Sequence, residues 1–407
     1  MITIVTHKKP HGDEICAIAI LKRFRAGAFY DAPVYTVGSD EEAKKFASEN
    51  RSILLGIGGG PFDEHGKDTA ECAATLVAEH VNLDPLKFFR LLEEVRASDL
   101  TAGKRRTHLP EIIKVLYEHH DEEVVCGWAL IAYDTLLKGI LENRIPLVER
   151  TEIVQEVAVE VLEEYSGQKH VLLRAWKEIQ ESVNNNKGTL TELSTVAELL
   201  SQTDSKLARW WLEVGLGAIF SRQIDFEEAL KKIKESRQFT VPFVKREGNS
   251  SMKWCGEFVG VFLRGQNSQF SRAFRSARGG CLDLAIVRND DGHVQIFSRV
   301  EAKIPMEFCV RAIRFAEARK RNSVRTLESF GCEERDSSVP QWFYFEKGGM
   351  LMNGSKSHPN VEVTRLTDDE ILETVKNAFH PDCTVRWAAQ KTVYANSSQR
   401  LVNPVLR

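Results

Sequence analysis

The sequence contains no uncharged apolar run of about 20 residues, the length that a membrane-spanning helix needs. The best candidate, VVCGWALIAYDTLL, contains Asp134. The chain starts with MITIV and continues at once with THKKPHGDE, which is unlike the basic, apolar and cleavage regions of a signal peptide. We therefore expect a cytoplasmic protein without a membrane segment.

The sequence also lacks any CxxC pair or regular framework among its 8 cysteines. This spacing argues against a zinc ribbon and favours reduced thiols, most of them in the core. There is no internal repeat and no low-complexity block. The formal net charge of -3 gives no general attraction for nucleic acid, so any site for a polyanion has to be local.

The order of strand and helix patterns predicts the fold class. With 407 residues, 43% of them hydrophobic and 28% charged, the chain is expected to form two or three globular domains. In residues 1–104, the runs ITIV, PVYTV and ILLGIGGG are typical of strands. EICAIAILKRF, DEEAKKFASEN and AECAATLVAEHV are typical of helices. This alternation predicts a parallel α/β sheet with functional loops at one edge.

The rest of the chain is expected to form two further parts. Residues 105–236 lose the strand patterns and show long amphipathic runs, such as EIIKVLYEHH and LARWWLEVGLGAIF, which predict a helical region. In residues 237–407 strands return, and Asp290, Asp291 and Gly292 join two of them in a hairpin pattern. A basic helix, an aromatic strand QWFYF and a last helix DDEILETVKNAF follow. This C-terminal part is predicted to be an α/β or α+β domain.

The first loop carries groups that can bind a metal. His7 is expected at the carboxyl end of the first strand, and His11 and Asp13 just before the following helix, so that all three face one crevice. Neutral imidazole and carboxylate suit Mn²⁺, Mg²⁺, Co²⁺ or Zn²⁺, and no thiolate lies nearby to select zinc. Two surface histidines beside lysines are the alternative interpretation.

Two further segments carry the same chemistry. Asp63, Glu64 and His65 follow the strand pattern ILLGIGGG, and Asp99 follows a helix. Because carboxyl ends of parallel strands lie at one edge of a sheet, we expect these groups to join the first loop.

The motifs THKKPHGDE, GIGGGPFDEH and ASDLTAG, in this order, resemble those of the DHH phosphoesterase superfamily, especially its MYG exonuclease branch. The resemblance extends over roughly the first 100 residues and implies a DHH-like metal-binding catalytic domain. It implies a divalent metal site, most simply Mn²⁺, whose ligands are His7, His11, Asp13, Glu64, His65 and Asp99. It also implies catalytic roles for Asp63 and His65.

Two positions depart from the superfamily pattern. Glu64 stands where the family has the first histidine of its triplet, which shifts the preference toward oxygen-binding metals. Gly56 stands where the strand before the triplet usually ends in a bridging aspartate. The site could therefore hold two ions or one. Two other functions stay open: a nucleotide- or RNA-binding module that has lost turnover, and a protein with a single structural zinc.

A basic segment, RGQNSQFSRAFRSARGG, is a candidate for substrate binding. Arg272, Arg275 and Arg278 are spaced by three and can share a helical face. Guanidinium groups bind phosphate oxygens, and the rings of Phe270 and Phe274 offer stacking surfaces for unpaired bases. A solvated surface turn is the alternative. Further on, the turn GGMLMNGS resembles the glycine-rich substrate loop of DHH-associated domains, which implies that Gly349 and Asn353 contact substrate.

These patterns predict a metal-dependent phosphodiesterase that acts on short single-stranded nucleic acid or on nucleotides. The resemblance suggests a 3′–5′ exonuclease, whereas cleavage of oligonucleotides or cyclic dinucleotides stays open. We expect residues 1–104 to bind the metals and residues 237–407 to bind the substrate. The chain could also form a homodimer.

Overall fold

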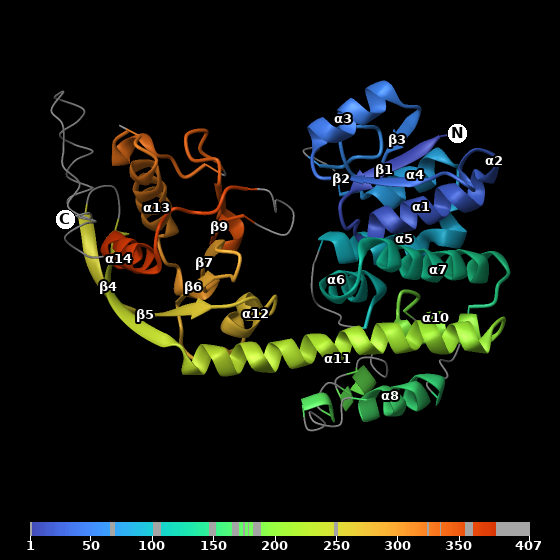
Figure 1. The fold of residues 1–407 in the computed structure, drawn as a ribbon. Coiled ribbons are helices and arrows are strands. Elements are labelled where there is room, and N and C mark those ends of the chain that lie inside the picture. Colours follow the sequence, from blue (N-terminus) through green and yellow to red (C-terminus); the bar gives the residue numbers. More distant parts are fainter. Residues whose placement is uncertain are drawn as a thin grey trace. The chain divides into compact units, whose positions relative to one another are not determined.

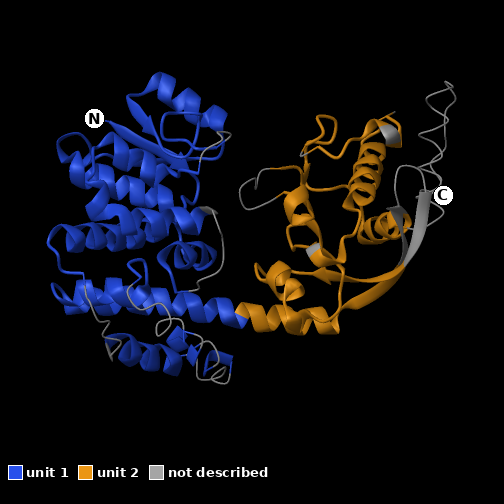
Figure 2. Cartoon of the chain, turned by 180° about the vertical axis from the view of Figure 1, so that it is seen from behind, with its two compact units in different colours: residues 1–224 blue, residues 225–407 orange. Residues whose placement is uncertain are grey.

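The computed structural model describes residues 2–65, 70–100, 107–145, 152–164, 171–173, 176–177, 179–181, 189–247, 251–323, 325–333, 335–354 and 361–379. The chain divides into two compact units, Met1–Ile224 (unit 1) and Asp225–Arg407 (unit 2), shown in Figure 2. The boundary falls within helix α11 (Ser205–Glu235). Unit 1 thus contains both the expected N-terminal sheet and most of the expected helical region.

Unit 1 is built on a three-stranded parallel sheet with the strand order β2-β1-β3 (Figure 1). The strands are β1 (Thr3–His7), β2 (Val34–Val37) and β3 (Ser52–Leu54), and the helices between and after them include α1 (Gly12–Phe24), α2 (Ala26–Phe29), α3 (Asp40–Glu49) and α4 (Ala73–His80). The predicted parallel α/β sheet is confirmed.

The sheet of unit 1 is covered on both faces, because successive side chains of a strand point to opposite sides. Ile4 joins the large core formed with α1 and the other helices. Val5 and Val37 instead pack with Ala43 of α3 and with Ile57. With both faces filled, the loops at the carboxyl ends of the strands remain for function.

The strand that was predicted over ILLGIGGG is shorter than expected. β3 ends at Leu54, and Leu55 adds only an isolated bridge to Phe62. Gly56, Gly58 and Gly59 then adopt φ of 62°, 77° and 69°. These left-handed conformations favour glycine and end the strand. The resulting turn brings the acidic triplet back to the edge of the sheet.

The described part of residues 105–236 is helical, apart from loops and one isolated bridge. The helices around and within it are α5 (Pro85–Leu100), α6 (Leu109–His119), α7 (Glu122–Leu141), α8 (Glu152–Glu164) and α10 (Leu193–Ser201). In the core, Trp128 and Trp211 stack with ring centroids 4.5 Å apart. Each indole N–H donates to the backbone carbonyl of the other residue.

Helix α7 is long and apolar enough to cross a membrane by length and composition. It packs against α1, α6 and α10, as a core helix does. Its Asp134 also forms a bidentate ion pair with Arg23 of α1, with N–O distances of 2.7 and 2.6 Å.

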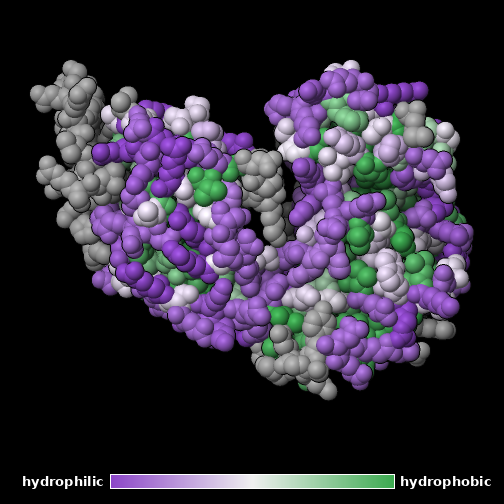
Figure 3. Space-filling view, in the orientation of Figure 1, coloured by the Kyte–Doolittle hydropathy of each residue, from purple (hydrophilic) through white to green (hydrophobic). Residues whose placement is uncertain are grey.

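Some apolar side chains of unit 1 reach the surface, as the green areas of Figure 3 show. Leu86 and Phe89, one helical turn apart on α5, are 91% and 61% exposed. Single exposed apolar residues are common on protein surfaces. The expected homodimer stays a prediction.

Unit 2 contains a six-stranded mixed sheet with the order β4-β5-β6-β7-β9-β8, in which only β5 and β6 pair in parallel. The strands are β4 (Arg237–Glu247), β5 (Ser251–Arg264), β6 (Leu284–Arg288), β7 (Val294–Ser298), β8 (Trp342–Phe345) and β9 (Met350–Asn353). The hairpin predicted at Asp290–Gly292 joins β6 and β7. Helices α12 (Phe270–Arg275), α13 (Met306–Lys320) and α14 (Asp368–Phe379) complete the unit.

Helices cover both faces of this sheet. One face, which includes Ile286 and Ile296, packs against α13 and α14. The other face, which includes Val287, packs against α12 and the last turns of α11. Phe270 and Phe274 lie in this second core with exposures of 3% and 0%. Our expectation that they stack with bases is therefore wrong: they lie one helical turn apart and share the buried face of α12.

Candidate metal centre

The loop between β1 and α1 is organised by Glu14, a residue that the sequence analysis did not select. Its Oε1 accepts hydrogen bonds from Thr6 Oγ1 and His7 Nδ1, both at 2.7 Å. Its Oε2 accepts one from the backbone N–H of His11, also at 2.7 Å. Glu14 is the third residue after the N-cap His11, the spacing of a capping box, and this spacing could have identified it.

Helix α6 fixes the same loop from the other side. Tyr117 donates its hydroxyl to the carbonyl of Pro10 at 3.0 Å, and Lys9 Nζ donates to the carbonyl of Tyr117 at 3.4 Å. Lys9 adopts φ of 57°, a left-handed conformation that is uncommon outside glycine. The helical region of unit 1 thus supports the geometry of the first loop.

Three of the expected ligands come together. His11, Asp13 and Asp99 place one potential ligand atom each within 4.8 Å of the others. Asp99 lies in the last turn of α5, so the expectation that it follows a helix is corrected, and residues 101–103 of its motif lie outside the described residues. Asp13 is only 4% exposed and accepts a hydrogen bond from the backbone N–H of Ala73 at 3.3 Å.

The triplet after β3 forms a second group, in which Asp63, Glu64 and His65 satisfy the same distance limit. Asp63 accepts hydrogen bonds from the backbone N–H of Gly59 at 2.6 Å and from the backbone and Nδ1 of His65 at 3.0 Å. Burial alone raises the pKa of Asp63, but these hydrogen bonds outweigh it and lower the pKa below the ordinary value. Asp63 therefore shapes its own loop and orients His65.

The two groups belong to one cluster. The rings of His7 and His65 meet edge to face with centroids 5.5 Å apart. Burial raises the pKa of Asp13 well above its ordinary range, and the charges of Glu14, Asp99 and Glu64 raise it further. Burial also raises the pKa of Glu64, and Asp99 and Glu14 again add to the effect. Carboxylates that change each other's pKa in this way lie close together.

The negative charge of the cluster also raises the pKa of His7, because it favours the protonated imidazole. Burial alone lowers the pKa of His7, but the hydrogen bond and the negative charge of Glu14 outweigh it and raise the pKa. Burial alone raises the pKa of Glu14, whereas its hydrogen bonds and the charge of His7 lower it. The two side chains thus form a partly buried ion pair when the imidazole is protonated.

The residues of the cluster fit a divalent cation. Glu64 Oε2 is buried and has no hydrogen-bond partner among the described residues. In the same part of the chain, no lysine or arginine forms an ion pair with Asp13, Asp63 or Asp99. A buried carboxylate oxygen without a donor is costly unless a cation satisfies it.

The nearby thiols do not compete as ligands. Cys16 and Cys72 are buried and lie close enough to Asp13 to interact with its charge. Burial raises the pKa of Cys16 well above its ordinary value, and burial and Asp13 raise that of Cys72 to about 12. Both therefore stay protonated at neutral pH, and the donors are imidazole and carboxylate groups that suit hard or borderline ions.

At Gly56, where the sequence departs from the superfamily pattern, a neighbouring carboxylate occupies the space that a side chain would need. A Cβ atom on Gly56 would lie 2.7 Å from Glu14 Oε1. The Glu14 carboxylate therefore fills the space next to the position where the superfamily resemblance leads us to expect an aspartate. A side chain at position 56 would also be strained at φ of 62°.

The arginines expected to bind substrate lie on α12 and the 3₁₀ turn after it in unit 2. Arg278 forms a bidentate ion pair with Glu227, with both N–O distances 2.5 Å, and also lies over the ring of Phe226. Arg272 lies over the same ring, with its guanidinium carbon 5.7 Å from the centroid. Arg275 donates to backbone carbonyls and forms no ion pair among the described residues.

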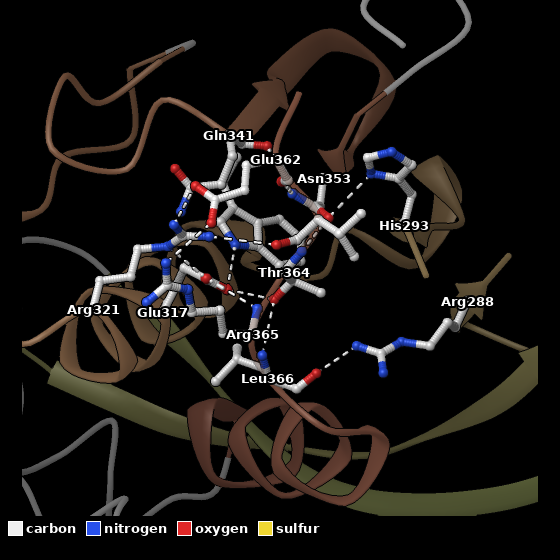
Figure 4. Close-up of polar contacts among 12 residues, drawn as sticks. Arg288, His293, Glu317, Arg321, Gln341, Asn353, Glu362, Thr364, Arg365 and Leu366 are labelled. Atoms are coloured by element: carbon white, nitrogen blue, oxygen red, sulfur yellow. Dashed lines mark hydrogen bonds and ion pairs between the residues drawn. The ribbon is translucent and has the colours of Figure 1, made fainter. Parts of the chain in front are cut away.

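Asn353 and Gly349 lie at the ends of β9. Asn353 is fully buried. Its side-chain oxygen accepts the N–H of Thr364 at 2.8 Å, and its amide donates to the carbonyls of Gln341 and Glu362 (Figure 4). These contacts attach the segment before α14 to the sheet. Gly349 adopts φ of 56°, and its carbonyl accepts the N–H of Ser298 at 3.0 Å.

Comparison of the chain with protein-family models, with curated proteins and with solved structures finds no match. The resemblance to DHH phosphoesterases therefore depends on the motif residues described above.

Proposed function

We propose that the protein is a divalent-metal-dependent phosphodiesterase that hydrolyses short nucleic acids or nucleotides, with 3′–5′ exonuclease activity as the first form to test. One observation carries the proposal. Imidazole and carboxylate groups from three separate segments meet in one cluster, and a buried Glu64 oxygen lacks a partner among the described residues. Such a donor set is typical of metal-dependent hydrolases.

Two histidines of the cluster, His7 and His65, each contact a carboxylate through Nδ1, as metal-bound histidines usually do. His7 Nδ1 lies 2.7 Å from Glu14, and His65 Nδ1 lies 3.0 Å from Asp63. With the proton on Nδ1, each ring leaves Nε2 available for an ion. A carboxylate that accepts the other ring N–H fixes the tautomer and the ring orientation.

The division of roles follows from these contacts. His11, Asp13 and Asp99 would hold one ion, and Glu64 with His7 and His65 would hold another or share it. A bound divalent ion supplies Lewis acidity toward the attacking water and the phosphoryl oxygens. The chain itself orients the imidazoles through Glu14 and Asp63.

Mn²⁺ is the ion that we propose, with Mg²⁺, Co²⁺ and Zn²⁺ as alternatives. Mixed carboxylate and imidazole donors suit Mn²⁺ and Co²⁺, whereas Mg²⁺ prefers oxygen alone. The substitution of Glu64 for histidine increases the oxygen share of the donor set.

A second candidate is a nucleotide- or RNA-binding module on the same fold that has lost turnover. The observation that favours it is Gly56, because Glu14 occupies the space beside it and is held by three hydrogen bonds. A carboxylate used in this way has less freedom to bridge two ions.

Metal content and turnover separate the candidates. We would measure divalent ions per chain after dialysis against Mn²⁺, and then hydrolysis of short RNA, short DNA, cyclic dinucleotides and a chromogenic phosphodiester with Mn²⁺, Mg²⁺ and Co²⁺. Asp13→Asn and Asp99→Asn are the site variants. Asp134→Asn is the matched control, because it removes an ion-paired carboxylate of the same unit on α7.

The expected result is bound Mn²⁺ and hydrolysis that falls at least about 1000-fold in both site variants and persists in the control. Binding of an oligonucleotide in chelator without turnover would instead favour the binding module. Unfolding by chelator together with no hydrolysis would indicate a structural ion. Full activity of either site variant at saturating Mn²⁺ would exclude the proposed centre.

A further inference from the structure

In unit 2, Arg275 and Arg299 each donate a hydrogen bond to a backbone carbonyl next to the other. Arg275 ends α12, and Arg299 directly follows β7. Arg275 Nη2 donates to the carbonyl of Ser298 at 3.2 Å, and Arg299 Nη2 donates to the carbonyl of Phe274 at 3.1 Å. Each guanidinium therefore binds the peptide group that precedes the other arginine. This reciprocal contact places both cations at one end of the sheet.

Both side chains also donate to glycine carbonyls and lie over aromatic rings. Arg275 Nη2 donates to the carbonyl of Gly348, and Arg299 Nη2 to that of Gly280, both at 2.6 Å. Arg275 lies 5.8 Å from the ring centroid of Phe297, and Arg299 lies 5.9 Å from that of Phe274. These two rings pack edge to face, 5.3 Å apart. The guanidinium groups are thus preorganised on a rigid aromatic pair.

The positive charge of this pair is not compensated by an ion pair. Among the residues that the structure describes, neither Arg275 nor Arg299 lies within ion-pair distance of a carboxylate, and Nη1 of each makes no hydrogen bond. Burial lowers the pKa of Arg275, and the exposed Glu301 acts on it only at longer range. By contrast, Arg278, Arg321 and Arg325 in the same unit each pair with a carboxylate.

A half-buried cation without an anionic partner is costly, and an anion that reaches both arginines would offset that cost. Their Nη2 atoms are held by carbonyls and their Nε atoms are buried, so the Nη1 atoms are the donors that remain for a ligand. Two guanidinium groups with free donors match the oxygens of a phosphate or phosphodiester.

We propose that Arg275 and Arg299 form an anion site that holds a phosphodiester of the substrate strand, and this assignment rests on the proposed function for the identity of the anion. Arg299 was not expected from the sequence. Arg278, which was, is already neutralised by Glu227. The proposed substrate-binding arginines are therefore the pair Arg275 and Arg299, and not the three arginines expected from the sequence.

The test is the salt dependence of binding in chelator, where no hydrolysis occurs. We would titrate the full chain with a labelled short single-stranded oligonucleotide at several salt concentrations. Arg275→Gln and Arg299→Gln remove the charge but keep an amide donor for the backbone carbonyls. Arg365→Gln is the matched control, because Arg365 is an exposed arginine of unit 2 that pairs with Glu362.

Each site variant is expected to bind about 5- to 30-fold more weakly and to reduce the slope of log K against log salt by about 0.7. The control should keep both values. An unchanged slope with a lowered Tm would show that the arginines only fasten the loops, and would overturn the proposal. An equal loss of slope in Arg278→Gln would also overturn it, because the charge of the whole segment would then act.

The chromogenic phosphodiester keeps this test separate from that of the metal centre. If the wild-type protein binds the oligonucleotide with the expected slope but hydrolyses nothing with any metal, the proposed function fails and the anion site stands. If it hydrolyses the chromogenic substrate and the arginine variants bind oligonucleotide as the wild type does, only the anion site fails.

Discussion

The two units differ in the groups that surround their buried carboxylates. In unit 2, Glu317 has an exposure of 0% and is fully hydrogen-bonded. It accepts from Arg321 Nε at 2.8 Å, Arg365 N–H at 3.1 Å and Trp342 Nε1 at 3.3 Å, and also from the hydroxyl of Thr364 (Figure 4). Its charge is thus compensated within the unit.

In unit 1, Asp13 is almost as deeply buried but faces Glu14, Glu64 and Asp99, all of the same sign. Its described donors are the backbone N–H groups of Ala73 and Glu14, and no cation pairs with it among the described residues. The comparison distinguishes a buried carboxylate whose charge is compensated by hydrogen bonds from one that is surrounded by other carboxylates. The first is surrounded by donors, whereas the second is crowded by like charges, and it is there that we propose a bound cation.

The largest effect is expected from Glu317→Ala. The substitution leaves an indole N–H, a hydroxyl and a backbone N–H without their acceptor, and it removes one of the two carboxylates that pair with Arg321, which together costs about 3–5 kcal/mol. Hydrogen exchange of unit 2 peptides measures this loss. Glu362→Ala is the control, because Glu362 pairs with the same Arg321 but is solvent-exposed, so that water replaces the lost contact and little loss of stability is expected there. Equal losses in both variants would contradict the distinction.

A smaller effect is expected from metal. At a Mn²⁺ concentration about 100 times its Kd, binding should stabilise the site by roughly 2.7 kcal/mol. Slower hydrogen exchange is expected in unit 1 peptides around the first loop and the end of α5, and not in unit 2. Asp99→Asn should abolish the effect. Equal protection of both units by Mn²⁺ would show that it binds elsewhere.

A stabilising substitution is predicted next. Asp13→Asn removes a charge from the crowded cluster and keeps an oxygen for the N–H of Ala73. Without metal, it should stabilise unit 1 by about 1 kcal/mol and raise Tm by about 2–4 °C. Asp134→Asn, which breaks the ion pair with Arg23, should not raise Tm. A lower Tm of Asp13→Asn in chelator would mean that Asp13 is structurally required, as Glu317 is.

The smallest effect concerns pH. Asp13, Glu64 and His7 all have raised pKa values in the folded protein, so the folded state binds more protons than the unfolded state. The stability of metal-free unit 1 should therefore fall as pH rises from about 5 to 8. The lowered pKa values of Asp63 and Glu14 act only at more acidic pH.

Thermal unfolding in chelator across this pH range measures the slope, and Asp13→Asn should make it shallower. Saturating Mn²⁺ should reverse the slope, because its ligands bind best when deprotonated. Stability in chelator that rises with pH would contradict the raised pKa values.

The sequence by itself determined the order of elements and the positions of the expected ligands. Short apolar runs alternating with helical patterns predicted the parallel sheet of unit 1, and the turn residues predicted the hairpin at Asp290–Gly292. The last helix spans Asp368–Phe379 as expected. These features depend on local sequence, since backbone propensity and turn chemistry act over a few residues. The same local rules placed His7, His11 and Asp13 beside one strand end.

Only the tertiary structure decided which groups face one another. It assigned Glu14 to His7, placed Asp99 in the last turn of α5, buried Phe270 and Phe274, and joined Arg275 to Arg299. Partners such as Arg275 and Arg299 are 24 residues apart and belong to different elements. Sequence patterns fix the face of each helix or strand, but not the neighbour against which that face packs. The compensation or strain of a charge depends on that neighbour, and so it appears only in the folded protein.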